Sequence, residues 1–152
     1  MKNFGRTPTA GNTYILSIAV IPVFAAGILY ETFLGHRHDY TGHFAAGYGG
    51  TLGAMMVMFR IQSGEQFTRS TAWSVVLMCV ACILLGAVAE ATAFRIAKFD
   101  EIDFCNQSIG AVLASMATLA LVGQTKPPDK VLDMELISGI AILGVGGCFA
   151  IA

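Results

Sequence analysis

The sequence is poor in charged residues. Asp, Glu, Lys and Arg make up 12% of its 152 residues, whereas a water-soluble domain of this size carries about 25%. So few charges cannot cover a globular surface with water-solvated groups, which argues against a soluble fold. The net charge of −1 argues against a nucleic-acid partner, because phosphate binding needs a concentrated basic face.

The four cysteines do not make a disulfide framework, and the chain has no internal repeat and no HExxH motif. Two of the four cysteines, Cys79 and Cys82, have CxxC spacing, but they sit inside an apolar run from Trp73 to Ala89. Without a βαβ context around it, this spacing predicts helix packing and not redox chemistry. The length of the chain predicts a single domain.

The sequence does contain five long stretches without Asp, Glu, Lys or Arg. They lie between Arg6 and Glu31, and over 40–59, 70–89, 104–125 and 136–152. A helix needs about 20 apolar residues to cross a bilayer, and in lipid only a helix satisfies the backbone of such a segment. We therefore predict an all-α integral membrane protein, a bundle of five transmembrane helices over 13–34, 40–60, 71–94, 103–123 and 134–152.

The Lys and Arg residues in the short loops set the orientation of these helices. Six of them fall on the side of the N-terminus, and three fall on the other side. The first group is Lys2, Arg6, Arg60, Arg69, Lys126 and Lys130, and the second is Arg37, Arg95 and Lys98. The imbalance predicts a cytoplasmic N-terminus, with the opposite end of the bundle facing outward.

Small residues recur in the second predicted helix. Ala45, Gly49 and Gly53 are spaced by four residues, and such a spacing lets helix backbones approach closely in lipid. Two interpretations stay open, packing within one protomer and packing against another membrane subunit or a second copy. The expected partners are therefore the lipid bilayer and other membrane proteins.

Acidic, amide and histidine side chains gather on the outward side of this topology. Asp39 and His43 are four residues apart and share a helix face, and Glu90, near the end of the third helix, is an ionisable group that needs a partner, for which His43 is a candidate. Asp100 and Asp103 either face a site with Gln107 or stabilise the start of the fourth helix. The candidate ligand-binding residues are Asp39, His43, Glu90, Asp100, Asp103 and Gln107.

Three histidines within eight residues raise a metal hypothesis. His36, His38 and His43, together with a carboxylate, form a candidate set for a divalent ion, since imidazole and carboxylate both bind zinc. In a pigment-bearing complex the same histidines would be candidate axial ligands. No cofactor is otherwise indicated.

The order of these residues resembles the VanZ-like family of small multi-pass membrane proteins. The resemblance rests on Asp39-x-x-x-His43, on Glu90, and on the block from Phe99 and Asp100 through Asp103 and Gln107 to Gly110, where Gln107 replaces the usual asparagine. The family is named after a protein associated with teicoplanin resistance. The resemblance implies a bacterial inner membrane and an outward-facing polar site, and it implies no reaction.

Three functional hypotheses follow. The first is a VanZ-like membrane protein whose acidic and histidine cluster contacts envelope lipid or a glycopeptide-like ligand. The second is a non-catalytic accessory subunit of a larger membrane complex. The third is a metal-dependent membrane hydrolase, in which a carboxylate or histidine base acts beside a bound ion.

Overall fold

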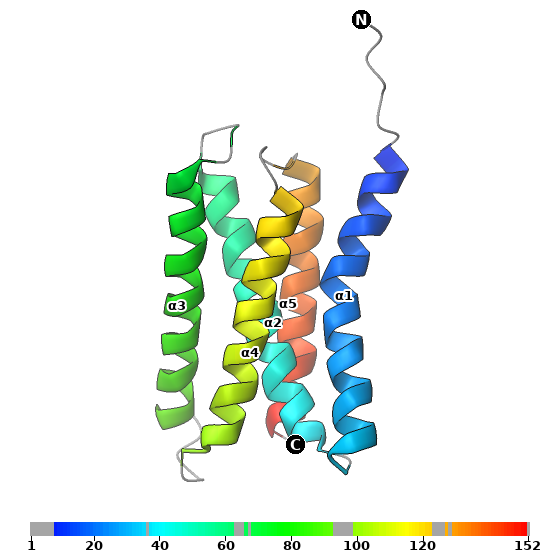
Figure 1. Cartoon of the computed structure of the whole chain (residues 1–152), viewed down its shortest axis with the longest axis vertical. Helices are drawn as coiled ribbons and strands as arrows, with labels where there is room; N and C mark the ends of the chain where they lie inside the picture. Colours follow the sequence, from blue (N-terminus) through cyan, green and yellow to red (C-terminus); the bar gives the residue numbers. More distant parts are fainter. Residues whose placement is uncertain are drawn as a thin grey trace, which may run out of the picture.

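The chain folds into five α-helices in a computed structural model that describes residues 8–35, 37–62, 66, 68–92, 99–122, 127 and 129–151. The prediction of an all-α protein with five helices is confirmed for these residues. Side chains of α1 are described from residue 20 onward. The helices are α1 (Pro8–Phe33), α2 (His38–Ile61), α3 (Arg69–Thr92), α4 (Glu101–Val122) and α5 (Asp129–Ile151), arranged as in Figure 1.

Local signals explain where several helices begin. Helix α1 begins at Pro8, before the expected residue 13, because proline's fixed φ suits the first helical position. Helix α5 begins at Asp129, before the expected residue 134, because an acidic residue in the first turn interacts well with the helix dipole. The turn between α1 and α2 passes through Gly35, whose φ of +72° favours glycine.

Helix α2 lies at the centre of the bundle. It packs most extensively against α5 and then against α4, while α1 and α3 lie on opposite sides of this group (Figure 1). The second and fifth helices run antiparallel (Figure 1). The central helix therefore links the other four.

Close approach between α2 and α5 depends on small residues. A Cβ at Gly49 would stand 2.5 Å from the backbone nitrogen of Leu143, and one at Gly139 would stand 2.7 Å from the backbone nitrogen of Gly53. Near the other end, a Cβ at Gly146 would stand 2.9 Å from that of Ala45. The small residues singled out in the sequence thus lie against α5 of the same chain.

Large apolar side chains fill the rest of the interior. The buried core cluster combines α2 residues with single residues from α3, α4 and α5. Its members are Phe44, Tyr48, Leu52, Met55, Met56, Phe59, Val75, Ala114 and Leu132.

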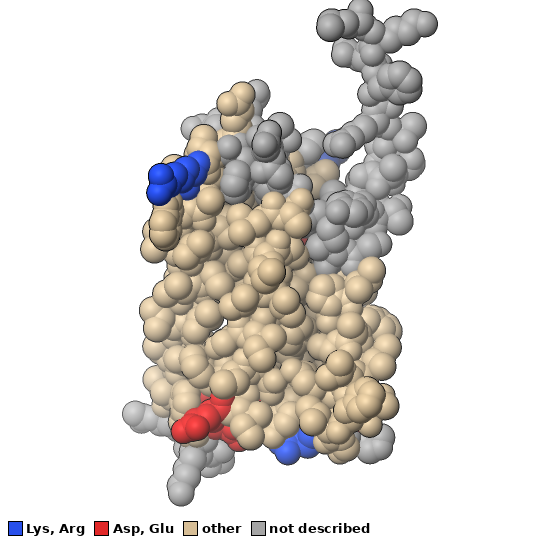
Figure 2. Space-filling model, in the orientation of Figure 1, with Lys and Arg blue, Asp and Glu red and all other residues tan. Residues whose placement is uncertain are grey.

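The outer surface is also apolar. On α3, Leu77 and Leu85 are each 67% exposed, and on α1, Phe24 is 69% exposed. On the face in Figure 2, the coloured charged residues lie toward the two ends, and the described surface between them carries none. Two helices, α3 and α5, are long and apolar enough to cross a membrane by length and composition, which favours membrane association. Helix α2 is poorer in apolar residues because glycine and polar residues occupy its packed interior faces.

Candidate functional site

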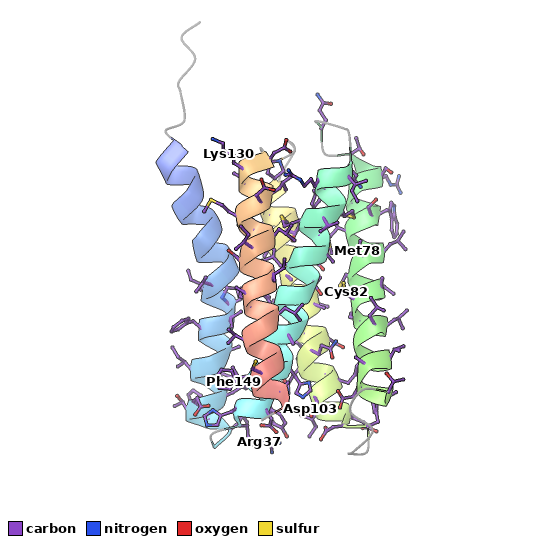
Figure 3. The ribbon with its side chains drawn as sticks, turned by 180° about the vertical axis from the view of Figure 1, so that it is seen from behind. Arg37, Met78, Cys82, Asp103, Lys130 and Phe149 are labelled. Carbon is purple, nitrogen blue, oxygen red and sulfur yellow. The ribbon has the colours of Figure 1, made fainter. Side chains whose placement is uncertain are left out.

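Several of the predicted polar residues meet at one end of the bundle, where α1 and α3 end and α2 and α4 begin. Figure 3 places Asp103 and Arg37 at this end and Lys130 at the opposite end. We define the polar cluster as Tyr30, His43, Glu90, Asp103 and Asn106. Its members come from four different helices.

His43 and Asp103 form the centre of the polar cluster. The His43 Nε2 atom lies 3.4 Å from Asp103 Oδ2, and His43 is only 7% exposed. Glu90, also 7% exposed, interacts electrostatically with both residues. Two acidic side chains and one imidazole are thus held together, and water reaches them only at the partly exposed Asp103.

Glycines on α2 and α4 make this approach of the helices possible. Gly47 of α2 faces the backbone of Gln107, and Gly110 of α4 faces the backbone of Phe44 and Tyr48. A Cβ at either glycine would overlap these atoms. Because α4 lies so close to α2, the first turn of α4 brings Asp103 within reach of His43.

The two aspartates at the start of α4 have different roles. Asp100 caps the helix: its Oδ1 accepts hydrogen bonds from the backbone N–H groups of Ile102, at 2.8 Å, and Asp103, at 3.3 Å, as N-cap aspartates do. Asp103 points to His43 with one oxygen, and its other oxygen, Oδ1, is buried with no hydrogen-bond partner among the described residues. The capping interpretation thus applies to Asp100, and the site interpretation applies to Asp103.

Asn106 joins the polar cluster, whereas Gln107 packs between helices. The Tyr30 O–H donates a 2.7 Å hydrogen bond to Asn106 Oδ1, linking α1 to α4. The Asn106 Nδ2 atom is buried and has no hydrogen-bond partner in the part of the chain that the structure describes. The side chain of Gln107 fills the space beside Gly86 of α3. Asn106 was not among the predicted site residues. Its position three residues after Asp103, on the same helix face, is the sequence signal that could have identified it, whereas Tyr30 has no such signal.

Asp39 lies at the edge of the site and pairs with Arg37. Two hydrogen bonds join them, Nε to Oδ1 at 3.1 Å and Nη2 to Oδ2 at 2.7 Å. The Arg37 guanidinium holds the pKa of Asp39 below its ordinary value and stacks over the Tyr40 ring at 3.8 Å. Although Asp39 and His43 are four residues apart, their side chains have different partners.

In the described part of the structure, the histidines predicted as metal ligands do not lie together. His38 Nδ1 lies 2.6 Å from Glu31 Oε1 at the exposed turn, whereas His43 faces Asp103 inside the bundle. His36 lies outside the described residues. Within the described ranges, no group of three His, Cys, Asp or Glu side chains is placed to hold a metal ion.

Fold and site together define an all-α five-helix bundle with a buried cluster of acids, histidine and amide at one end. No family model, curated protein or solved structure matches this chain. The VanZ-like resemblance therefore stays a prediction that the motif residues alone support.

Proposed function

We propose that this chain is a multi-pass protein of the bacterial inner membrane, similar to VanZ-like proteins, whose polar cluster faces outward and binds the amine-bearing head group of an envelope lipid. The buried His43–Asp103 pair beside Glu90 is the observation that carries the proposal. The membrane setting and the ligand chemistry are argued separately below.

The exposed apolar side chains support the membrane setting. Helix α3 exposes large apolar residues along most of its 24 residues, about 36 Å at 1.5 Å per residue, enough for a hydrocarbon core of about 30 Å. In water, an apolar patch of this extent is unfavourable and marks an interaction surface. A surrounding bilayer covers it on all sides.

The basic residues support the orientation. Arg60 lies in the last turn of α2, Arg69 begins α3, and Lys130 lies in the first turn of α5, all at the end opposite the polar cluster. Arg37 is the described basic residue at the cluster's own end. Because Lys and Arg favour the cytoplasmic side, the polar cluster faces outward.

The charges of the polar cluster favour a cationic group. Glu90, Asp103 and the nearby Asp100 interact electrostatically with one another. Among the described residues, the basic side chains that act on this group are His43 and Arg37, and Arg37 is paired with Asp39. A phosphate would meet like charge here, whereas an ammonium would pair with the carboxylates. Asp103 Oδ1 offers an acceptor to the ammonium, and Asn106 Nδ2 offers a donor to a neighbouring oxygen of the same head group.

Native mass spectrometry tests the ligand. The full chain in detergent is mixed with equal amounts of phosphatidylethanolamine and phosphatidylglycerol, and the retained lipid is identified. We expect the chain to retain the ethanolamine lipid in preference to the glycerol lipid. In Asp103→Asn, the affinity for the ethanolamine lipid is expected to fall by about tenfold, because a charge-assisted hydrogen bond contributes about 1.5–3 kcal/mol.

The matched control is Asp133→Asn. Asp133 is an acid at the opposite end, paired with Arg60 at 2.7 Å, and its loss is expected to leave lipid retention unchanged. Equal retention of both lipids, or equal effects of the two substitutions, would refute the proposed ligand.

A second candidate function is an accessory subunit of a membrane complex. Gly144 and Gly147 of α5 have no described atom within 4 Å of where a Cβ would stand, so no described helix of this chain covers them. A helix of another subunit can approach closely at such residues. If Gly144→Leu releases proteins that co-purify with the wild-type chain from its native membrane, this candidate is supported; an unchanged set of partners counts against it.

A further inference from the structure

A second buried acid lies far from the polar cluster. Glu135 is on α5 and only 1% exposed, and both carboxylate oxygens are buried without a hydrogen-bond partner among the described residues. Three residues earlier, on the same face of α5, Leu132 belongs to the apolar core with Phe59 and Val75. The carboxyl group is thus buried on the side of α5 that contributes to the apolar core.

Arg60, Arg69 and Lys130 are the described Lys and Arg residues at the nearer end of the bundle, and none of them is hydrogen-bonded to Glu135. Tyr48 of α2 is the ionisable group that interacts with it electrostatically, and Arg60 of α2 is engaged by Asp133. Helix α4 has no ionisable residue after Cys105. On α3, Cys79 and Cys82 are the ionisable residues from 70 to 89, and on α1 Tyr14 and Tyr30 are those between Arg6 and Glu31.

An isolated carboxylate cannot stay charged in such surroundings. Its desolvation is strongly unfavourable unless a counter-charge or several hydrogen bonds compensate for it. A metal or alkali cation needs several oxygen ligands, whereas the Tyr48 hydroxyl is the one side-chain oxygen in the core cluster, whose other members are apolar. A proton needs none of these, since it makes the group neutral.

We propose that Glu135 is a proton-binding site: the side chain carries a proton inside the bundle and exchanges it with the end that bears Arg60 and Asp133. Asp133 lies two residues earlier on α5 and its side chain is 50% exposed, so this end is the shorter way to water. Proton release would leave an uncompensated charge on the face of α5 that packs against α2. The site goes beyond lipid binding and does not depend on it.

Infrared spectroscopy of the full chain in detergent tests the protonation directly. A protonated carboxyl group absorbs separately from a carboxylate and from the amide bands, and its band shifts in heavy water. We expect this band at neutral pH in the wild type, its loss on alkalinisation, and its absence in Glu135→Gln. Asp133→Asn, two residues away, is expected to keep the band. If the wild type lacks the band at neutral pH, or if Glu135→Gln retains it in full, the proposal is wrong.

Thermal unfolding at different pH values gives an independent test. The unfolded chain releases the Glu135 proton near the ordinary glutamate range, about pH 4.3, whereas the folded chain keeps it. Stability therefore falls as the pH rises above this range, until the folded chain also loses the proton. The melting temperature is expected to fall by a few °C per pH unit, roughly.

Glu135→Gln is neutral and close in shape to the protonated acid, so it is expected to fold and to lose this fall in melting temperature. Asp133→Asn should keep the slope of the wild type. An equally steep fall in Glu135→Gln and in the wild type would overturn the proposal, even if both proteins fold.

Discussion

Helices α2 and α3 have the same length of 24 residues but opposite surroundings. Helix α2 buries thirteen of its residues, many of them glycine, alanine or polar, whereas α3 buries only Val75, Gly86 and Glu90. Yet α3 is the more apolar of the two by composition. In a water-soluble protein the more apolar helix would be the more buried one.

Under the proposed membrane setting, this difference has a physical explanation in the forces that hold the bundle together. In lipid, apolar side chains gain little by leaving the surface, so helices associate through close packing and interhelical hydrogen bonds. Small residues on α2 serve the packing, and His43 serves the polar contacts. The large apolar residues of α3 remain on the outside, where lipid covers them under the proposed function.

The largest expected effect comes from filling the α2–α5 interface. Gly139→Leu places a side chain where a Cβ already meets the backbone of Gly53 and Gly49, so the helices must separate. We expect the free energy of unfolding to fall by about 3 kcal/mol or more, measured by denaturation in mixed detergent.

Gly144→Leu is the matched control on the same helix, because a Cβ at Gly144 meets no described atom within 4 Å. It is expected to leave the stability of the chain nearly unchanged. Equal destabilisation by the two substitutions would mean that close packing of α2 on α5 is not what stabilises the bundle.

The next effect concerns the exposed face of α3. Leu84, which is 59% exposed, lies well inside this helix, so Leu84→Asp would place a charge in the bilayer at about 2.5–3.5 kcal/mol on insertion scales. We expect a marked decrease in the fraction of protein that resists alkaline extraction from membranes.

Arg69→Asp, at the first residue of α3, is the control, and its effect on extraction should be small because a helix end reaches the polar interface. A wild-type protein that is itself released by alkaline extraction would contradict the membrane setting. In that case the exposed face of α3 would not lie in lipid, and a charged residue on it would not change the extraction.

The number and type of the helices could be predicted from the charge-free runs, because a long helix with mostly apolar side chains needs a long stretch of sequence without charged residues. The ends of the helices could not, since they depend on Pro8, Asp129 and other residues outside the apolar runs. His43, Glu90 and Asp103 were predicted as site residues from the topology. His43 was also predicted as a partner of Glu90, and the two interact electrostatically. The pairing of His43 with Asp103 was not predicted, because it depends on how closely α4 approaches α2.

Glu135 shows the limit of predicting spans from charges. The charge-free run begins at Leu136, so the predicted helix of 134–152 placed Glu135 in its first turn, at the end of the span. In the structure it lies within α5, on the face that packs against α2. Its spacing of four from Gly139 and of eleven from Gly146 follows the helical period, and this pattern was the available signal.

A smaller effect is expected at the hydrogen bond between α1 and α4. Tyr30→Phe removes the 2.7 Å bond to Asn106 Oδ1 and leaves that part-buried acceptor without its partner. We expect a loss of about 1–2 kcal/mol in the free energy of unfolding. Tyr40→Phe, next to the exposed Arg37, should cost less; an equal loss would mean that the Tyr30 hydroxyl adds nothing specific.

The smallest effect on stability is expected at Arg37 and Asp39, because exposed ion pairs are screened by solvent. The hydrogen bonds from Arg37 lower the pKa of Asp39, so their contribution is present above the ordinary aspartate range, about pH 3.9, and is lost as the pH falls through the lowered value. Carbon-13 NMR of the Asp39 carboxyl should show a higher pKa in Arg37→Gln. Arg60→Gln, at the other end, should leave the Asp39 titration as it is. An unchanged titration in Arg37→Gln would show that this exposed pair does not hold in solution, in contrast to the buried pairing of His43 with Asp103.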